Sequence, residues 1–378
     1  MPDAPPPFPT LAPAAAPPVP VLPALAAIDQ PQTIDAVEVF AVAADLVIRV
    51  RLSSGVTGHW LAQHQLRKVV SVLTEVVAPF YLGRDARAVA SLPGELYRAH
   101  GNYKLAGMPL WSCVAVVEAA VLDALGLLLQ LPVCALLGPV LRRELPVYLS
   151  SMERGTTPEQ EVACFERALA ATGARALKIK VGGRLSRNAD AAPGRSPRLV
   201  ELCRRRFPDL TLIADANGSY DADGALAVGR WLEQMGVSMF EEPCPWEDLE
   251  ATRRVADALA LPVSGGEQDT SLDKLAWMAR RRVVDVLQPD LMYAGGLTRG
   301  LTIAAHAAAA GLPVVPHNAA GGSLTLLMLH FAAVAPNLYP FQELNLRGGK
   351  PLPPYATGFN PTPTAGHLSV PTTPGLGL

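Results

Sequence analysis

Paired cysteines, long apolar runs and an excess of charge of one sign are all missing from this chain of 378 residues. Its five cysteines are scattered and show no CxxC spacing, which argues against a zinc site and against a disulfide framework. No uninterrupted apolar run reaches the ~20 residues that a membrane-spanning helix needs. The net charge of −2 offers no basic surface for nucleic acid or an anionic membrane. We therefore expect a cytoplasmic protein with reduced thiols and without nucleic-acid or membrane partners.

Proline is concentrated at the start of the chain, where residues 1–31 hold 11 of the 36 prolines. This segment has no basic stretch followed by a continuous apolar core, so it does not resemble a signal peptide. We predict an extended or disordered arm that packs over its own chain or on a neighbouring subunit. Half of all residues are hydrophobic, which is enough for a large core in one large domain or in a large and a small one.

Residues 32–140 show the pattern of a small α+β domain, with strands first and helices after them. Two apolar stretches before a turn at Ser53-Ser54-Gly55 indicate strands, and the later stretches repeat their apolar residues with the period of a helix. The expected elements are strands at 34–41 and 46–52 and helices at 62–79, 86–99 and 111–129.

Residues 141–344 change to short apolar strands that alternate with amphipathic helices. The expected strands are 146–150, 176–181, 210–215, 237–242, 262–266, 283–288, 312–316 and 339–342, and helices between them include 158–172, 221–235, 247–259 and 297–310. Such βα units imply a parallel sheet with right-handed crossovers, and seven units plus a final strand favour a (β/α) barrel over an open sheet. A barrel of this kind carries its chemistry at the carboxyl ends of the strands. Residues 345–378 are expected to pack back on the small domain.

Three acidic residues follow three successive apolar strands at one interval: Asp215, Glu241 and Glu267 are each 26 residues apart. The interval fits one strand, one helix and two loops, so the three carboxylates are expected side by side at one end of the barrel. Ligands that are all oxygen suit a hard divalent ion such as Mg²⁺. A single acid here would be assigned to a helix N-cap or a loop salt bridge, but three in even register favour a metal site.

Two lysines, Lys178 and Lys180, lie on the strand before this triplet. Residues i and i+2 of a strand point to one face, so both ammonium groups are expected in the barrel mouth. Burial and a neighbouring positive charge both lower a lysine pKa, which would allow one of them to act as a general base. The alternative is a pair of surface lysines on an edge strand. Asn217 faces the same way as Asp215 and is a candidate for substrate binding.

A histidine and two further acids follow the last three strands. Asp290 ends the sixth strand and His317 the seventh, so the two residues are expected side by side. A carboxylate bonded to an imidazole fixes its tautomer and stabilises its charged form. Glu343 on the last strand is a further hydrogen-bond donor or acid. Lysines and histidine would face each other across the metal, an arrangement that suits proton removal beside a carboxylate.

With these residues the chain resembles the enolase superfamily, in its mandelate racemase branch. The resemblance covers nearly everything after the arm. It rests on Lys178-x-Lys180, Asp215-x-Asn217, Glu241-Glu242-Pro243, Glu267, Asp290 with His317, Glu343 and the ending at 371–377. It implies a modified (β/α)₇β barrel, an N-terminal α+β capping domain completed by the C-terminal segment, and Mg²⁺ on Asp215, Glu241 and Glu267. It also implies Lys180 as one base tuned by Lys178, His317 with Asp290 as the other, and Glu343 as a hydrogen-bond partner of the substrate carboxylate.

Two stretches depart from the family pattern. Ala43-Ala44-Asp45 leaves almost no loop between the first two strands, where a mobile loop usually covers the substrate. The stretch 182–196 is longer than usual after the lysine strand. Its arginines Arg184, Arg187 and Arg195 could meet an anionic substrate, but we expect solvated loop arginines.

The function that we predict is dehydration of a sugar acid, with a small-molecule carboxylate substrate and a homo-oligomer between dimer and octamer. The alternatives are a racemase or epimerase of a 2-hydroxy acid, which needs the same two bases, and a non-catalytic homologue, which would have lost a ligand or a base. Specificity is expected to reside in capping-domain residues, with His59, Trp60 and Tyr103 as candidates.

Overall fold

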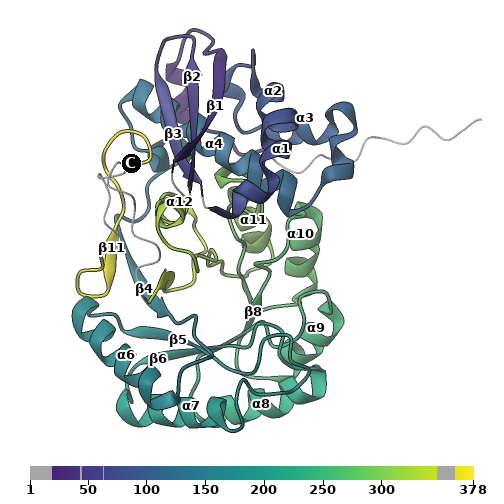
Figure 1. The fold of residues 1–378 in the computed structure, drawn as a ribbon, viewed down its shortest axis with the longest axis vertical. Helices are drawn as coiled ribbons and strands as arrows, with labels where there is room; N and C mark the ends of the chain where they lie inside the picture. The colour runs from purple at the N-terminus through teal and green to yellow at the C-terminus, as the bar shows by residue number, and fades with distance from the viewer. Residues whose placement is uncertain (1–18, 43–44, 63, 347–361) are drawn as a thin grey trace, which may run out of the picture.

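The computed structural model describes residues 19–42, 45–62, 64–346 and 362–378, which form a small antiparallel layer above a curled parallel sheet (Figure 1). The parallel sheet is closed by bridges into a barrel whose helices lie outside it. The fold predicted from the sequence, an N-terminal capping domain on a modified (β/α)₇β barrel, is thereby confirmed.

The capping layer is a three-stranded antiparallel sheet packed on one long helix. Its strands are β1 (Ile34–Val42), β2 (Asp45–Leu52) and β3 (Thr57–Ala62), and the helix is α4 (Met108–Leu129). Strand β3 was not predicted because its inward position 58 is a glycine, which interrupts the apolar alternation. A Cβ on Gly58 would lie 2.1 Å from Ala120 O, so only glycine lets α4 approach the sheet this closely.

The first of the two predicted helices before α4 is present as one uninterrupted helical run whose turn type changes along it, and the second is divided into short helices. The first stretch consists of η2 (His64–Val69), α1 (Val70–Val72), a π-helical turn η3 (Leu73–Val77) and α2 (Ala78–Tyr81). The second divides into η4 (Ala86–Ala88), α3 (Leu92–Arg98) and η5 (Ala99–Leu105). Pro93 lies in the first turn of α3, where a proline is tolerated, and Pro79 follows directly on the π-helical turn η3.

Seven strands and one bridged segment make up the barrel. The parallel strands follow the order β10-β4-β5-β6-β7-β8-β9. Their bounds are β4 (Glu144–Ser150), β5 (Ala176–Lys180), β6 (Thr211–Asp215), β7 (Met239–Glu241), β8 (Val263–Gly265), β9 (Val286–Leu287) and β10 (Gln342–Asn345). The predicted strand 312–316 is reduced to bridges of Val314 with Leu287 and with Leu338, which close the gap between β9 and β10.

Helices α6, α8 and α9 begin close to their predicted positions and carry side-chain N-caps, and α11 begins at its predicted residue without one. Thr157 and Gln160 form a complete capping box at α6 (Pro158–Thr172). The other helices are α7 (Arg195–Arg206), α8 (Ala222–Gln234), α9 (Leu249–Ala258), α10 (Leu272–Arg281), α11 (Leu297–Ala309) and α12 (Ser323–Val334). Helix α7 starts inside the stretch that we expected to be a loop through residue 196.

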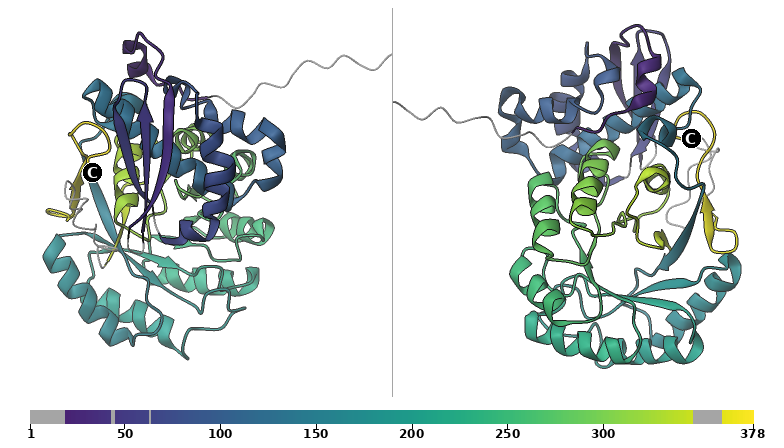
Figure 2. Two further views of the ribbon diagram at one scale, coloured as in Figure 1. Left: turned by 45° about the horizontal axis from the view of Figure 1, so that its top comes forward. Right: turned by 180° about the vertical axis from the view of Figure 1, so that it is seen from behind.

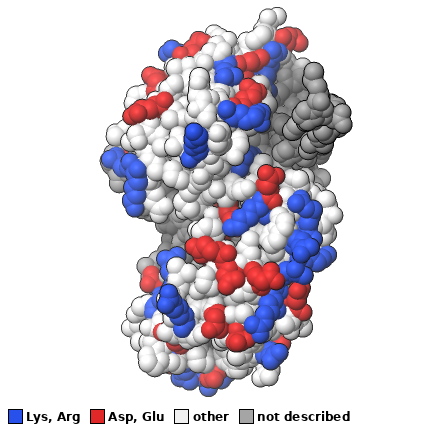
Figure 3. Space-filling model, turned by 90° about the vertical axis from the view of Figure 1, so that its right-hand side faces the viewer, with Lys and Arg blue, Asp and Glu red and all other residues white. Residues whose placement is uncertain are grey.

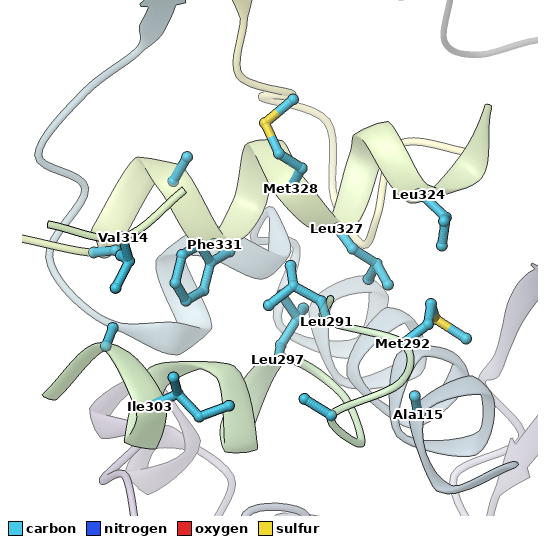
Figure 4. Close-up of a cluster of buried hydrophobic side chains, with 14 of the residues drawn as sticks. Ala115, Leu291, Met292, Leu297, Ile303, Val314, Leu324, Leu327, Met328 and Phe331 are labelled. Atoms are coloured by element: carbon cyan, nitrogen blue, oxygen red, sulfur yellow. The ribbon is translucent and has the colours of Figure 1, made fainter. Parts of the chain in front are cut away.

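Capping layer and barrel share one hydrophobic core. Figure 4 shows how Phe331 and Leu327 of α12 face Leu291, Leu297 and Met292, with Ala115 of α4 beside them. By length and composition, α4 could cross a membrane, although 78% of its most apolar window is buried inside the protein. Its two acids, Glu118 and Asp123, interrupt the apolar run and bind backbone N–H groups of α11 and of the C-terminal segment.

Both ends of the described chain fold onto the body. The turn η1 (Pro23–Ala27) buries Leu22 and Leu25 beside α5 (Val133–Leu137), so the predicted arm is folded in its last part, and residues 1–18 lie outside the described chain. Near the other end, β11 (His367–Ser369) pairs antiparallel with β4, and Leu376 N donates to Asp123 of α4. The predicted short link at Ala43-Ala44 also lies outside the described residues. Figure 2 shows the two ends of the described chain from two further sides.

Charges of both signs are interspersed on the face shown in Figure 3. This distribution agrees with the small net charge of the sequence. The expected absence of nucleic-acid and membrane partners, the cytoplasmic location and the homo-oligomeric state stay predictions.

Candidate active site

The predicted lysines and acids lie in one row across the carboxyl ends of three neighbouring strands. Lys180 of β5 pairs in register with Asp215 of β6, and Asp215 pairs with Glu241 of β7. Parallel strands in register bring these side chains to the same level of the barrel. All three are buried although all three can carry charge.

Both lysines form ion pairs inside this row. Lys178 Nζ lies 2.6 Å from Glu241 Oε1, 2.8 Å from Glu343 Oε1 and 3.7 Å from Asp215 Oδ2. Lys180 forms an ion pair with Asp215. The alternative of two surface lysines is therefore excluded.

The lowered pKa that we expected is not found at Lys178. Burial does oppose its charge, but the carboxylates of Glu241 and Glu343 outweigh burial and hold the pKa of Lys178 well above its ordinary value. The sequence argument failed because it counted the neighbouring lysine and not Glu343, which approaches from a strand more than 160 residues away. Lys178 is thus a fixed cation of the site.

The carboxylates outnumber the cations that face them. Burial opposes ionisation of Asp215, but Lys180 and Lys178 outweigh it and hold the pKa of Asp215 well below its ordinary value. For Glu241, burial together with the charges of Asp215 and Glu343 outweighs Lys178 and raises the pKa well above its ordinary value. The site therefore has a place for more positive charge.

His317 is held between two acids. Its Nδ1 lies 2.8 Å from Asp290 Oδ2 and its Nε2 lies 3.5 Å from Glu267 Oε2. A bridge between Asp290 and His317 aligns their backbones as predicted. Burial opposes the imidazolium, but Glu267 and the bond to Asp290 outweigh it and raise the pKa of His317 to about 10.

Glu343 acts as an acceptor here, whereas we predicted a donor or acid. Its Oε2 accepts the backbone N–H of Asn318 at 2.7 Å, and its Oε1 faces Lys178. Burial raises its pKa, but Lys178 and His317 outweigh burial and lower the pKa of Glu343 to about 2.

Three further polar residues of the site, Gln288, Glu242 and Asn318, were given no role in the sequence analysis, whereas Asn217 was predicted. Gln288 donates from Nε2 to Glu241 Oε2 at 2.8 Å, and Asn217 donates from Nδ2 to Glu242 Oε2 at 3.2 Å. Burial and the nearby charge of Glu267 raise the pKa of Glu242 to about 8. Asn318 is the third, through its bonds to Glu343. Their positions could have identified them, because each residue lies at or next to the end of a predicted strand.

The contacts of the capping-domain candidates lie within the capping layer, and their role in substrate binding stays a prediction. Trp60 is fully buried in the core of the capping layer. His59 lies on β3 opposite Arg49, and Tyr103 lies on η5 with its ring against Tyr97. Among the described residues, a cavity of about 290 Å³ is lined by η2, the start of α4 and the residues Met292 and Tyr293, whose backbone N–H groups donate to Asp290.

The chain belongs to the mandelate racemase and muconate lactonizing enzyme family of the enolase superfamily. The model of the N-terminal domain of that family matches residues 24–138, and the enolase C-terminal domain-like model matches residues 160–378. The prediction of an enzyme of this superfamily is confirmed by the membership.

The chain is similar to relatives along most of its length. It is 28% identical over 306 residues to the arabinonate dehydratase of Saccharolobus solfataricus, with 81% of this chain and 79% of that protein covered. A solved structure from Roseobacter denitrificans, provisionally described as a racemase, has a TM-score of 0.85 at 34% identity and covers 91% of this chain and 95% of its own. A mandelate racemase/muconate lactonizing protein of Paracoccus denitrificans, solved with magnesium, has a TM-score of 0.83 at 27% identity over 92% and 95% of the two chains.

Proposed function

We propose that the protein removes the proton next to the carboxylate of a sugar acid and expels the β-hydroxyl as water, which gives a 2-keto-3-deoxy acid. The observation that carries this proposal is the placement of two proton-transfer groups on opposite sides of one buried row of acids. Lys180 reaches the row through Asp215, and His317 reaches it through Glu267. The similarity to an arabinonate dehydratase supports sugar acids as the substrate class.

The donor set fits a divalent cation. The three predicted ligands Asp215, Glu241 and Glu267 are buried carboxylates on consecutive strand ends, and Glu241 lacks matching charge. Oxygen ligands and uncompensated negative charge are what Mg²⁺ requires. In the described residues no three His, Cys, Asp or Glu side chains are gathered as a ready metal site, and Lys178 and Lys180 contact two of the acids. A bound Mg²⁺ would supply positive charge to the substrate carboxylate and so ease removal of the adjacent proton.

Each residue of the site would then have its own role in the reaction. Lys180, as the neutral amine left when its ammonium gives up a proton to solvent, takes the proton from the carbon beside the carboxylate, and Lys178 keeps a fixed positive charge near the acids. His317 gives its Nε2 proton to the departing hydroxyl, which leaves as water. Asp290 holds Nδ1, which sets the direction in which Nε2 points. The enol that remains becomes the keto acid when carbon 3 takes a proton.

Racemisation is the second candidate, favoured by the same two opposed groups and by the likeness to the Roseobacter structure. His317 would then return a proton to the opposite face of the same carbon. The two outcomes differ in product, because dehydration gives a keto acid and racemisation gives an isomer of the substrate.

The test is a panel of aldonic acids, including arabinonate, galactonate and gluconate, incubated with purified protein and Mg²⁺. We expect a keto acid from at least one of them, detected with semicarbazide at 250 nm or so. Isomerisation of an acid without loss of water would replace the dehydratase assignment by the racemase. Turnover by His317→Asn at the wild-type rate would remove the histidine from the mechanism.

A further inference from the structure

Arg195 is buried at the carboxyl end of β5 and bonds only to backbone. It is 4% exposed and forms the first residue of α7. Its Nη1 donates to Lys180 O at 3.2 Å, Nε to Thr156 O at 3.0 Å and Nη2 to Glu153 O at 3.1 Å. One side chain thus ties the last peptide of β5 to the loop that follows β4.

A second arginine acts in the same way one strand further on. Arg154, in the loop after β4, donates from Nε to Gly182 O at 3.0 Å. Its Nη2 lies 3.4 Å from both Val181 O and Asp215 O. The carbonyl of Asp215 also accepts the N–H of Val181 at 2.9 Å, so β5 and β6 are joined at this point by backbone and by guanidinium.

The choice of arginine at position 195 needs a reason, because a buried charge without a carboxylate costs stability, whereas Arg154 is only partly buried. Among the described residues, neither Arg154 nor Arg195 forms an ion pair. A backbone carbonyl oxygen has two lone pairs, so the carbonyl of Asp215 can accept the guanidinium of Arg154 in addition to the N–H of Val181. A guanidinium has five donors in a rigid fork and satisfies several carbonyls at once, which a lysine ammonium on its flexible stem does not.

Arg195 bonds the carbonyl of Lys180 and Arg154 bonds the carbonyl of Asp215. The side chains of these same two residues meet in the site. We propose that Arg195 and Arg154 are positioning residues, which fix the last peptides of β5 and β6 and thereby hold the Lys180 ammonium against Asp215. A peptide that is fixed on its carbonyl side fixes the direction in which the side chain leaves the backbone. The role of Lys180 as the base rests on the proposed function, but its placement by Arg195 does not.

The chain contains a matched control in the same helix. Arg204 of α7 also donates to two backbone carbonyls, Leu210 O and Gly236 O, each at 2.7 Å. These carbonyls precede β6 and β7, so they lie at the amino ends of the strands, away from the acids. Loss of Arg204 therefore removes the same kind of bond without touching Lys180.

The experiment compares Arg195→Met, Arg154→Met and Arg204→Met in the full-length protein. For Arg195→Met we expect kcat to fall by about 10- to 100-fold with KM changed less than about threefold, because a reacting group displaced by 1 Å costs roughly that much. Arg154→Met should show the same pattern to a smaller degree. Arg204→Met should lower the melting temperature and leave kcat unchanged. Equal kcat in the Arg195 and Arg204 variants would overturn the proposal.

A crystal structure of Arg195→Met separates this proposal from the proposed function. We expect Lys180 Nζ to leave ion-pair distance of Asp215, whether or not any acid is turned over. An unmoved ammonium would contradict the positioning role, while a wild-type protein without dehydratase activity would contradict only the function. Should Arg195→Met fail to fold, Arg195→Lys keeps the charge but not the fork, and a kcat equal to that of the wild type would refute the need for a guanidinium.

Discussion

Two layers lie inside the barrel, one above the other, on the same strands. The lower layer is a separate cluster of buried side chains, made of Tyr148, Ala176, Ile213, Met239, Val286 and Val315. The upper layer consists of the residues two positions further along each strand or its continuation, namely Ser150, Lys178, Asp215, Glu241, Gln288 and His317, together with Lys180, which is paired in register with Asp215. Residues two apart share a face of a strand, so both layers point into the barrel. A step of about 7 Å along the strands changes an apolar floor into a charged surface.

The two layers differ in what they do for the protein. Burial of the floor stabilises the barrel, because each side chain leaves water for apolar contacts. The upper layer keeps charges out of water, and the Oγ of Ser150 and the Oε1 of Gln288 have no hydrogen-bond partner within the described chain. Buried polar groups without partners cost stability. Their concentration at one end of the barrel indicates that this layer is kept for binding and chemistry.

The largest effect is expected from removal of the base in the upper layer. Lys180→Met should lower kcat by about a thousandfold or more, since general base catalysis contributes 10²–10⁴-fold. The variant should also lose some stability, because Asp215 keeps only Lys178 as a buried cationic neighbour, so kcat is compared on folded protein. Steady-state kinetics with the best acid of the panel and a thermal melt measure the two effects. A variant with near-wild-type kcat would show that Lys180 is not the base.

A substitution in the floor should lower the stability of the protein but leave its activity nearly unchanged. Met239→Ala leaves a cavity below Glu241 and should lower the free energy of unfolding by roughly 3 kcal/mol. The folded molecules should keep kcat within about tenfold of the wild type. Chemical denaturation and kinetics below the melting temperature test this pair of expectations. Loss of kcat as large as that of Lys180→Met would mean that the layers are not separable.

The upper layer could be located from the sequence, but its charge states could not. The interval between Asp215, Glu241 and Glu267 places acids at strand ends because each βα unit repeats the same geometry. The pKa of Lys178 depends on Glu343, whose approach is set by closure of the barrel. Gly58 concealed β3, since its missing side chain is explained only by the helix packed on it. Arg195 was expected in solvent because loops that bury a charge leave no periodic signal.

His330 extends the comparison to a buried polar group outside both layers. Its Nδ1 accepts Cys134 N–H at 3.1 Å and its Nε2 lies 3.2 Å from Leu376 O, so both nitrogens are used and the ring is neutral. Burial lowers the pKa of His330 to about 4. Below pH 6.5 the unfolded chain binds a proton that the folded chain does not, so its contribution to stability is lost as the pH falls from 6.5 to 4.

At pH 5 the free energy of unfolding is lower by about 2 kcal/mol because of His330, which is the smallest of these effects. His330→Gln removes the titration, so the stability difference between wild type and variant should shrink by this amount between pH 7 and 5. Urea denaturation at both values measures the difference. A difference that does not depend on pH would show that His330 titrates normally in the fold.

Deuterium incorporation tests the central claim most directly, namely that the upper layer removes a proton beside a carboxylate. The protein is incubated with Mg²⁺ and the acids of the panel in D₂O, and the products are followed by proton NMR. We predict a 2-keto-3-deoxy acid that carries one deuterium at carbon 3, and no such product from Lys180→Met. If wild-type protein loaded with Mg²⁺ neither exchanges the proton beside the carboxylate nor eliminates water from any acid, the account is contradicted.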